Sequence, residues 1–319
     1  MANAAPGMLP AQQVTLDAIR TPGPERPTYA GDFAAELRNR AESALAELVD
    51  PAHDIESRGL WVRKRDLAGV FGCQARHLAE AASPFAWTVP IARGIVLHKA
   101  VELSTHRRFE PEDAVDAALE RLVADNDNLG SFLADASDGE LADLTANCVA
   151  LLTRFSETFP PMQRAWRPTA EVSARARLCG GAFVLVGKYD LTLGSPAPLG
   201  GPDGRQRAGK VIIDLKTGSR SPTDPEDLRF YALVETLSIG VPPLGIGSFY
   251  VAEGRLEHET VTAGVLDSAL RRTVDGIGRL IALRRGDHEP HRVPGPPCRW
   301  CPISAECGPG QEWLSDPDD

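Results

Sequence analysis

The residues best suited to chemistry are two aspartates and a lysine at the ends of two apolar segments. Asp190 ends the run GAFVLVGKYD, and Asp214 and Lys216 lie in KVIIDLKTG with Leu215 between them. Residues two apart on a strand share a face. Asp214 and Lys216 would therefore project together, while Leu215 turns into the core and leaves its carbonyl near the same edge. Two carboxylates and a carbonyl form a hard oxygen site suited to Mg²⁺ or Mn²⁺.

Such a site could hydrolyse a phosphodiester. A bound ion lowers the pKa of water and neutralises charge that develops on the phosphate, and Lys216 could orient or help to deprotonate that water. The alternative is a turn cap at Asp190 and an ordinary ion pair between Asp214 and Lys216. Two observations favour the metal site. Carboxylates are costly in a strand buried on both sides unless they are paired or metal-bound, and Lys216 is one of only five lysines.

Further motifs occur in a fixed order around these residues. Gly187 to Asp190 reads G-x-x-D, Asp214 to Lys216 reads D-x-K, and Gly94 to His98 reads G-x-x-x-H. Together these motifs resemble the RecB-like branch of the PD-(D/E)XK nuclease superfamily. Tyr231 lies where that branch has the tyrosine of its Q-x-x-x-Y helix, but Asp227 takes the place of the glutamine.

The resemblance covers roughly residues 60 to 310 and implies a divalent-metal-dependent deoxyribonuclease that acts on single-stranded DNA or DNA ends, in repair, recombination or defence. It implies a set of metal ligands: His98, Asp190, Asp214 and the Leu215 carbonyl. It also implies four catalytic residues: Lys216, Asp214, Asp190 and Tyr231. An imidazole among oxygen ligands would favour Mn²⁺ over Mg²⁺ somewhat. Glu171, on the preceding strand, could point toward the same pocket, and its role stays open.

Three of the six cysteines form a C-x2-C-x5-C pattern near the end of the sequence: Cys298, Cys301 and Cys307. Three thiolates make an incomplete site, and Cys73 is the best candidate for the fourth ligand. The arrangement is similar to that of iron-sulfur members of the branch, the AddB-type and CRISPR-associated exonucleases, which implies a structural four-iron, four-sulfur cluster. Zinc is the alternative, with the same four cysteines or with His77 or His291 as the fourth ligand. The remaining two, Cys148 and Cys179, are interpreted as small hydrophobic residues.

Charge and composition limit the partners. The formal net charge of -10 argues against holding nucleic acid by bulk charge, so DNA contact needs a local patch. Four arginines could supply it: Arg175, Arg177, Arg220 and Arg229. No P-loop motif for a motor is seen, so processive action would require a partner such as a helicase. No run approaches the roughly 20 apolar residues of a membrane helix, and a cytoplasmic protein is expected.

The patterning predicts one compact α/β (α+β) domain over residues 31–310. The resemblance implies that its core is restriction-endonuclease-like, with a mixed central sheet flanked by helices. Residues 1–30 are expected to be a disordered leader. A helical part carrying Cys73 and His98 is expected over 31–165, the core sheet with its helices over 166–290, and a cysteine-rich metal-bound tail over 291–319.

Two other functions remain compatible with this sequence. A non-catalytic DNA-binding or assembly module could keep the nuclease fold, and the substitution of Asp227 for glutamine keeps that reading open. A zinc-clasped interaction protein would hold zinc tightly and show no metal-dependent cleavage.

Overall fold

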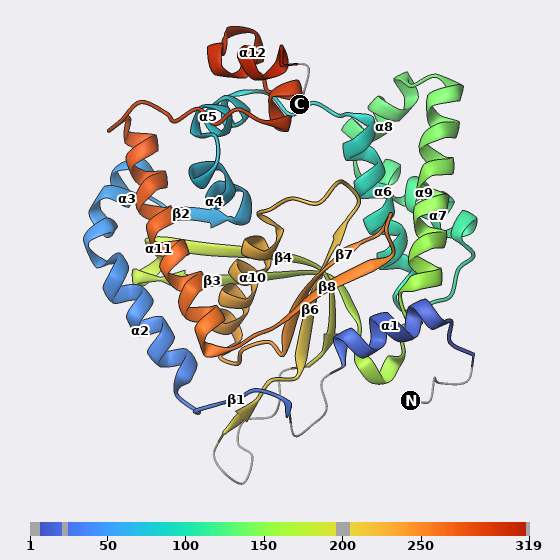
Figure 1. Ribbon diagram of the computed structural model, residues 1–319, viewed down its shortest axis with the longest axis horizontal. Helices are drawn as coiled ribbons and strands as arrows, with labels where there is room; N and C mark the ends of the chain where they lie inside the picture. The colour runs from blue at the N-terminus through green and yellow to red at the C-terminus, as the bar shows by residue number, and fades with distance from the viewer. Residues whose placement is uncertain (1–6, 21–24, 196–204, 317–319) are drawn as a thin grey trace.

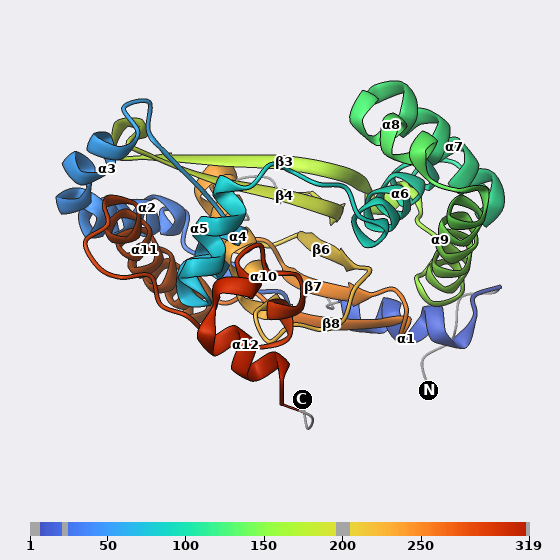
Figure 2. The same ribbon diagram turned by 90° about the horizontal axis from the view of Figure 1, so that it is seen from above.

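The core of the protein is a six-stranded mixed sheet with helices on both faces (Figures 1 and 2). The computed structural model describes residues 7–20, 25–195 and 205–316. The strands of the sheet are β2 (Leu60–Arg63), β3 (Thr169–Leu178), β4 (Phe183–Gly194), β6 (Lys210–Lys216), β7 (Gly245–Tyr250) and β8 (Arg255–Thr260). Their order is β2-β4-β6-β7-β8, with β3 also paired to β4. This architecture confirms the predicted fold class.

The helices and a small second sheet surround this core. The first group is α1 (Pro10–Ile19), α2 (Phe33–Leu45), α3 (Val49–Ile55), α4 (Lys64–Phe71), α5 (Gln74–Ala82) and α6 (Val89–Ser104). The second is α7 (Pro111–Asp125), α8 (Asp127–Asp135), α9 (Asp138–Thr158), α10 (Asp224–Ile239), α11 (Ala263–Arg285) and α12 (Gly308–Leu314). The strands β1 (Thr28–Tyr29) and β5 (Gln206–Arg207) pair antiparallel. Among these described helices, none is long and apolar enough to cross a membrane.

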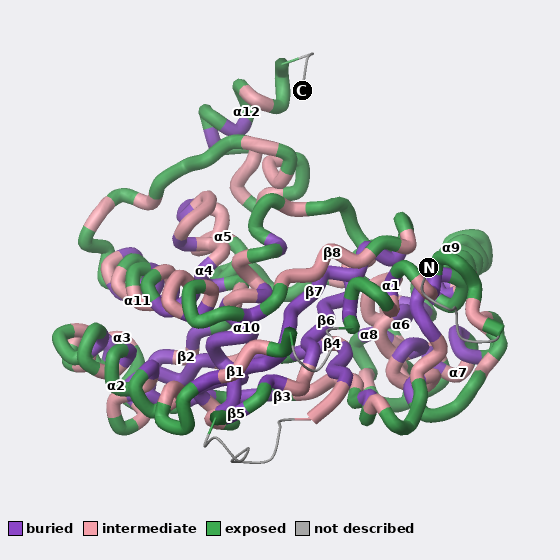
Figure 3. Tube along the Cα trace, turned by 60° about the horizontal axis from the view of Figure 1, so that its bottom comes forward, coloured by how far each residue is buried: buried purple, intermediate pink, exposed green. Residues whose placement is uncertain are grey.

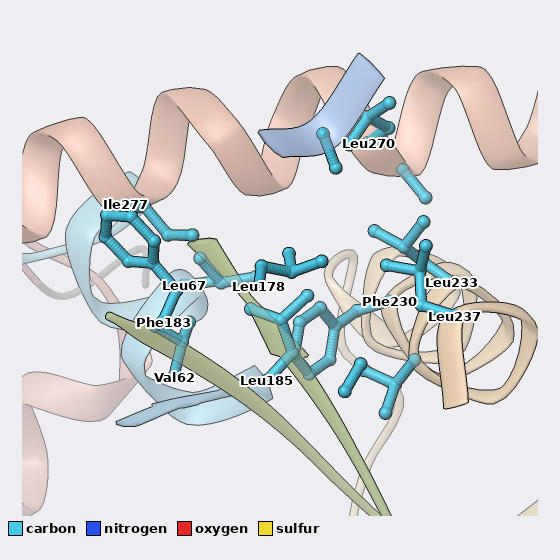
Figure 4. Close-up of a cluster of buried hydrophobic side chains, with 14 of the residues drawn as sticks. Val62, Leu67, Leu178, Phe183, Leu185, Phe230, Leu233, Leu237, Leu270 and Ile277 are labelled. Carbon is cyan, nitrogen blue, oxygen red and sulfur yellow. The ribbon is translucent and has the colours of Figure 1, made fainter. Parts of the chain in front are cut away.

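Strand periodicity divides the apolar side chains between two cores. In β6, Ile212 packs with α10 and α11 on one face, whereas Val211, Ile213 and Leu215 pack with α6 and α9 on the other. Figure 4 shows the first core, where Phe183 and Leu185 of the sheet lie among side chains of α4, α10 and α11. The central strands are buried along most of their length (Figure 3). Both faces of β6 are therefore covered, as its continuous apolar run predicts.

The prediction of a disordered leader over residues 1–30 is wrong for residues 10–19, which form α1. The Gln12 amide donates to the Ser156 carbonyl at 2.7 Å, and the Thr15 hydroxyl donates to the Thr158 carbonyl at 2.8 Å. Both acceptors lie in the last turn of α9, where carbonyls lack partners within the helix. Hydrogen bonds from polar side chains, rather than a stripe of apolar residues, attach α1 to α9. Hydrophobic periodicity therefore did not predict this helix.

Residues 64–82, within the predicted helical part, form two helices, α4 and α5, separated by Gly72 and Cys73. Helix α5 folds back closely on α4, since a Cβ at Gly69 would fall 2.4 Å from His77 Nδ1. Cys73 consequently precedes α5 as its N-cap residue instead of lying within a helix.

A buried ion pair between Lys210 of β6 and Glu235 of α10 gives the first testable prediction. Their side chains are 14% and 2% exposed. Replacing Glu235 by Ala leaves the Lys210 ammonium buried without its partner, so we expect the free energy of unfolding to fall by about 3–5 kcal/mol. Urea unfolding measures this change. The double variant Lys210→Met/Glu235→Leu should recover most of the loss, and a Glu235→Ala protein as stable as the wild type would contradict the prediction.

Candidate active site

The candidate site lies in a gap along one edge of β4. Strand β2 pairs parallel with β4 up to Arg63↔Val186, and β6 pairs antiparallel with the same strand from Lys210↔Gly194 up to Ile213↔Leu191. The C-terminal ends of β2 and β6 therefore approach each other along β4. The residues of β4 between the two pairings are 187–190, the G-x-x-D motif.

Asp190 connects this gap to α6. Its Oδ2 accepts a hydrogen bond from the Leu215 backbone N–H at 2.7 Å, and its Oδ1 lies 3.3 Å from His98 Nδ1. The other ring nitrogen of His98, Nε2, lies 3.1 Å from the Leu215 carbonyl. Burial by itself would lower the pKa of His98. The hydrogen bond to Asp190 and the charge of Asp190 have the larger combined effect, so the pKa of His98 is raised above its usual value. His98, Asp190 and Leu215 thus meet at one point.

Helix α6 reaches this point because Gly94 lies against the turn after β6. A Cβ on Gly94 would be 3.3 Å from Thr217 Oγ1, closer than most side-chain contacts. One turn further along the helix, His98 then faces the end of β6. The glycine of the G-x-x-x-H motif therefore has a packing reason in this chain.

Asp214 is held between two ammonium groups. Its Oδ1 lies 3.0 Å from Lys64 Nζ, and its Oδ2 lies 3.0 Å from Lys216 Nζ. Burial opposes ionisation of Asp214, but the charges of Lys64 and Lys216 outweigh it and hold the pKa of this carboxyl below its usual value. The Leu215 side chain is buried on the opposite face. The D-x-K motif therefore projects as its strand spacing predicts.

Helix α10 surrounds the two lysines with acidic and aromatic groups. Asp224 Oδ1 lies 2.8 Å from Lys216 Nζ, and its Oδ2 accepts a hydrogen bond from the Tyr250 hydroxyl at 2.9 Å. Asp227 lies 3.8 Å from Lys64. Tyr231 is buried, and Lys64 Nζ lies 4.9 Å from the centroid of its ring. Tyr231 therefore contacts the site through Lys64, and its catalytic role stays a prediction.

Glu171, whose role the sequence left open, joins His98 and Asp190. One ligand atom from each of these residues lies within 4.8 Å of the others, which is compatible with a bound metal ion. Glu171 has a left-handed backbone with φ of 55°, a conformation that is strained for a residue with a side chain. It also pairs with Lys188 of β4.

An open cavity of about 440 Å³ connects these groups. Its lining includes Lys64, Gly94, His98, Asp190, Asp214, Leu215, Lys216 and Asp224. Two of these residues, Lys64 and Asp224, were not predicted as site residues from the sequence. Asp224 begins a helix eight positions after the D-x-K motif. For Lys64, the only signal in the sequence was that the chain has just five lysines.

Two of the four arginines predicted to form a DNA-binding patch are paired with carboxylates. Arg220 pairs with Glu253 at 2.6 Å and also contacts Glu257, while Arg229 pairs with Glu259 at 2.9 Å. Arg175 stacks on the Trp61 ring, with 5.2 Å between its Cζ and the ring centroid. A phosphate would have to compete with carboxylates for Arg220 and Arg229.

A second cavity, of about 490 Å³, is lined by all four predicted cluster cysteines: Cys73, Cys298, Cys301 and Cys307. His77 also lines it. The tail is tied to α5 independently of the cysteines, because the Gln74 side-chain oxygen accepts the His291 N–H at 3.0 Å and the Ala75 N–H donates to the His291 carbonyl at 3.2 Å. The structure thus brings α5 and the C-terminal segment together here.

Comparison with known proteins identifies the family. The model of the PD-(D/E)XK nuclease superfamily matches residues 67–308. The chain belongs to this superfamily. No curated protein matches it. Of solved structures, a "Putative exonuclease" from Eubacterium rectale has a TM-score of 0.46 at 15% identity, covering 80% of this chain and 90% of that one. A protein designated SSO0001 has a TM-score of 0.29 at 15% identity, covering 69% of this chain and 97% of that one.

Membership in the superfamily agrees with the site described above. The matched span contains the three sequence patterns that end at His98, Asp190 and Lys216, and it also contains Cys73 and Cys307. Lys64 and the strand β2 lie before its first residue. The divalent metal ions used by these nucleases match the chemistry of a site built from carboxylates, an imidazole and a carbonyl.

Proposed function

We propose that this protein is a divalent-metal-dependent deoxyribonuclease of the RecB-like branch, acting on single-stranded DNA or DNA ends in repair, recombination or defence. The observation that carries the proposal is the position of His98. Its ring reaches both Asp190, at 3.3 Å, and the Leu215 carbonyl, at 3.1 Å, in the cavity that also holds Lys216. Residues of three separate motifs converge there, as a hydrolytic metal centre requires.

The donor groups fit a divalent cation. His98, Asp190, Asp214 and the Leu215 carbonyl would hold the ion, and Glu171 adds a carboxylate on the side of His98 and Asp190. Oxygen donors with one imidazole suit Mg²⁺ or Mn²⁺. When bound, the ion supplies Lewis-acid stabilisation of the phosphodiester and makes a water molecule more acidic.

Lys216 is the residue that orients the reacting groups. Burial lowers the pKa of Lys216, but the negative charge of Asp214 outweighs burial and raises it, so the side chain stays an ammonium at neutral pH. Asp214 and Asp224 fix its position from two sides, at 3.0 and 2.8 Å. A fixed ammonium donates hydrogen bonds to an attacking water or to a phosphate oxygen without reorganisation.

We also propose a structural four-iron, four-sulfur cluster bound by Cys73, Cys298, Cys301 and Cys307. The sulfurs of Cys298 and Cys307 both lie within 3.6 Å of the place that a Cβ on Gly310 would take. All four cysteines line one cavity of about 490 Å³, so a single bound group could take all four as ligands. Four thiolates also suit tetrahedral zinc, which is the alternative occupant of this cavity.

The deciding experiment is cleavage of end-labelled DNA by anaerobically purified protein. Single- and double-stranded substrates are incubated with Mn²⁺, Mg²⁺ or a chelator, in parallel with Lys216→Ala and with Lys99→Ala as the control. Lys99 pairs with Glu102 at 2.7 Å on α6 and is not among the cavity residues. We expect metal-dependent cleavage by the wild type and the control, and a loss of at least about 100-fold in Lys216→Ala.

The same assay distinguishes the alternative function. If wild type and Lys216→Ala bind DNA equally and neither cleaves with any metal, the nuclease proposal fails and a DNA-binding or assembly module takes its place. The two substrates also report the strand preference. Cleavage that continues without loss over long DNA would contradict the expectation that processive action needs a partner motor.

A further inference from the structure

Lys64 has a position that its place in the sequence does not suggest. It directly follows β2, whose pairing with β4 ends at Arg63↔Val186, at the edge of the gap that holds Asp190. Its ammonium consequently reaches Asp214, 150 residues away in the sequence, at 3.0 Å. Lys64 lines the same cavity as Lys216.

The two lysines differ in how firmly carboxylates hold them. Lys216 has close contacts with both Asp214 and Asp224, at 3.0 and 2.8 Å, and its side chain is 17% exposed. Lys64 has one close carboxylate, Asp214, while Asp227 lies 3.8 Å away, and its side chain is 30% exposed. Lys64 is therefore the more accessible cation, and an ammonium carries three N–H donors.

The cavity needs such a cation to accept a polyanion. Three aspartates line it: Asp190, Asp214 and Asp224. Each would repel a phosphodiester unless it is neutralised. Lys216 is committed to two of these aspartates, and the predicted arginines Arg220 and Arg229 pair with glutamates. Lys64 also lines the cavity, and its ammonium has N–H donors beyond the one that its single close carboxylate, Asp214, accepts.

We propose that Lys64 is a second catalytic lysine, which contacts a phosphodiester of the bound DNA beside the metal ligands. This assignment rests on the proposed nuclease function. Asp227 then acts as the counter-charge that keeps the Lys64 side chain over the Tyr231 ring and directed at the cavity. The competing explanation is that Lys64 only neutralises the buried Asp214, in which case it would not contact DNA.

Salt dependence of DNA binding separates these explanations, because each phosphate contact adds about 0.7 to the slope of log affinity against log salt for single strands. We compare wild type, Lys64→Met and Lys99→Met with a labelled single strand in chelator, where no cleavage occurs. Lys64→Met should lower the slope by about 0.7. Lys99→Met, a lysine of comparable exposure outside the cavity, should leave the slope unchanged.

Single-turnover cleavage at saturating Mn²⁺ gives the second measurement. Lys64→Met should lower the rate by about 100-fold, and Lys64→Arg, which restores the charge, should recover part of it. An unchanged salt slope would overturn the proposal whatever the cleavage rate, and a reduced rate with an unchanged slope would favour the explanation that Lys64 only neutralises Asp214. If Lys64→Met fails to fold in a thermal unfolding scan, Lys64→Gln, which can still donate a hydrogen bond to Asp214, replaces it. A wild type that does not cleave would refute the nuclease proposal, while the salt slope would still test the phosphate contact.

Discussion

Replacing Asp214 by Asn is expected to reduce metal-dependent cleavage by about a thousandfold or more. The substitution removes a charged metal ligand, and the neutral amide cannot balance the two ammonium groups 3.0 Å away. Loss of Lewis-acid stabilisation is worth several kcal/mol at the transition state, and loss of a positioned donor costs a further 10²–10³ in rate. The measurement is the single-turnover rate at saturating Mn²⁺.

A matched control separates catalysis from folding in this experiment. Asp275→Asn makes the same chemical change at a 54% exposed side chain on α11, where Asp275 pairs with Arg279. It should cleave at the wild-type rate. Thermal unfolding of both variants shows whether Asp214→Asn remains folded. A folded Asp214→Asn protein that cleaves within tenfold of the wild type would exclude Asp214 from the proposed metal centre.

Replacing Cys298 by Ser is expected to abolish iron binding and to lower the free energy of unfolding by about 4 kcal/mol or more. The proposed cluster closes a loop of more than two hundred residues between Cys73 and Cys298, and cross-links over loops of that size contribute stability on this scale. Iron and sulfide content of anaerobically purified protein, together with urea unfolding, measure both effects. Cys73→Ser should behave in the same way, because each residue supplies one ligand.

The control for this prediction is Cys179→Ser. Cys179 is not among the residues that line the cysteine cavity, and its Sγ lies 3.6 Å from the Glu42 carbonyl, a contact that a serine hydroxyl can make. The Cys179→Ser protein should retain its full iron content. Stoichiometric zinc in place of iron would instead favour the zinc-clasped alternative, and unchanged iron in both Cys298→Ser and Cys73→Ser would remove these residues from the ligand set.

Several features could be predicted from the sequence because they depend on local periodicity. Alternation along KVIIDLKTG placed Asp214 and Lys216 on one face and Leu215 on the other, and the structure has this arrangement. The glycine pair at the turn between β3 and β4 and the regular apolar spacing along α11 are local patterns of the same kind. In each case the physical cause is a repeat of two or 3.6 residues, or a backbone conformation that glycine adopts at low cost.

Other features depend on contacts between distant segments, and the sequence does not encode them in any local pattern. The parallel pairing of β2 with β4 brings Lys64 to Asp214, and the packing of α5 against the tail brings Cys73 into the cavity of the other three cysteines. Likewise, Arg220 and Arg229 resemble available cations in the sequence, but the neighbouring strand β8 and the turn before it supply their carboxylate partners. The sequence by itself determined which side chains can bind metal or phosphate. The tertiary structure decided which of them share a cavity, because strand register and helix packing set distances between residues far apart in the chain.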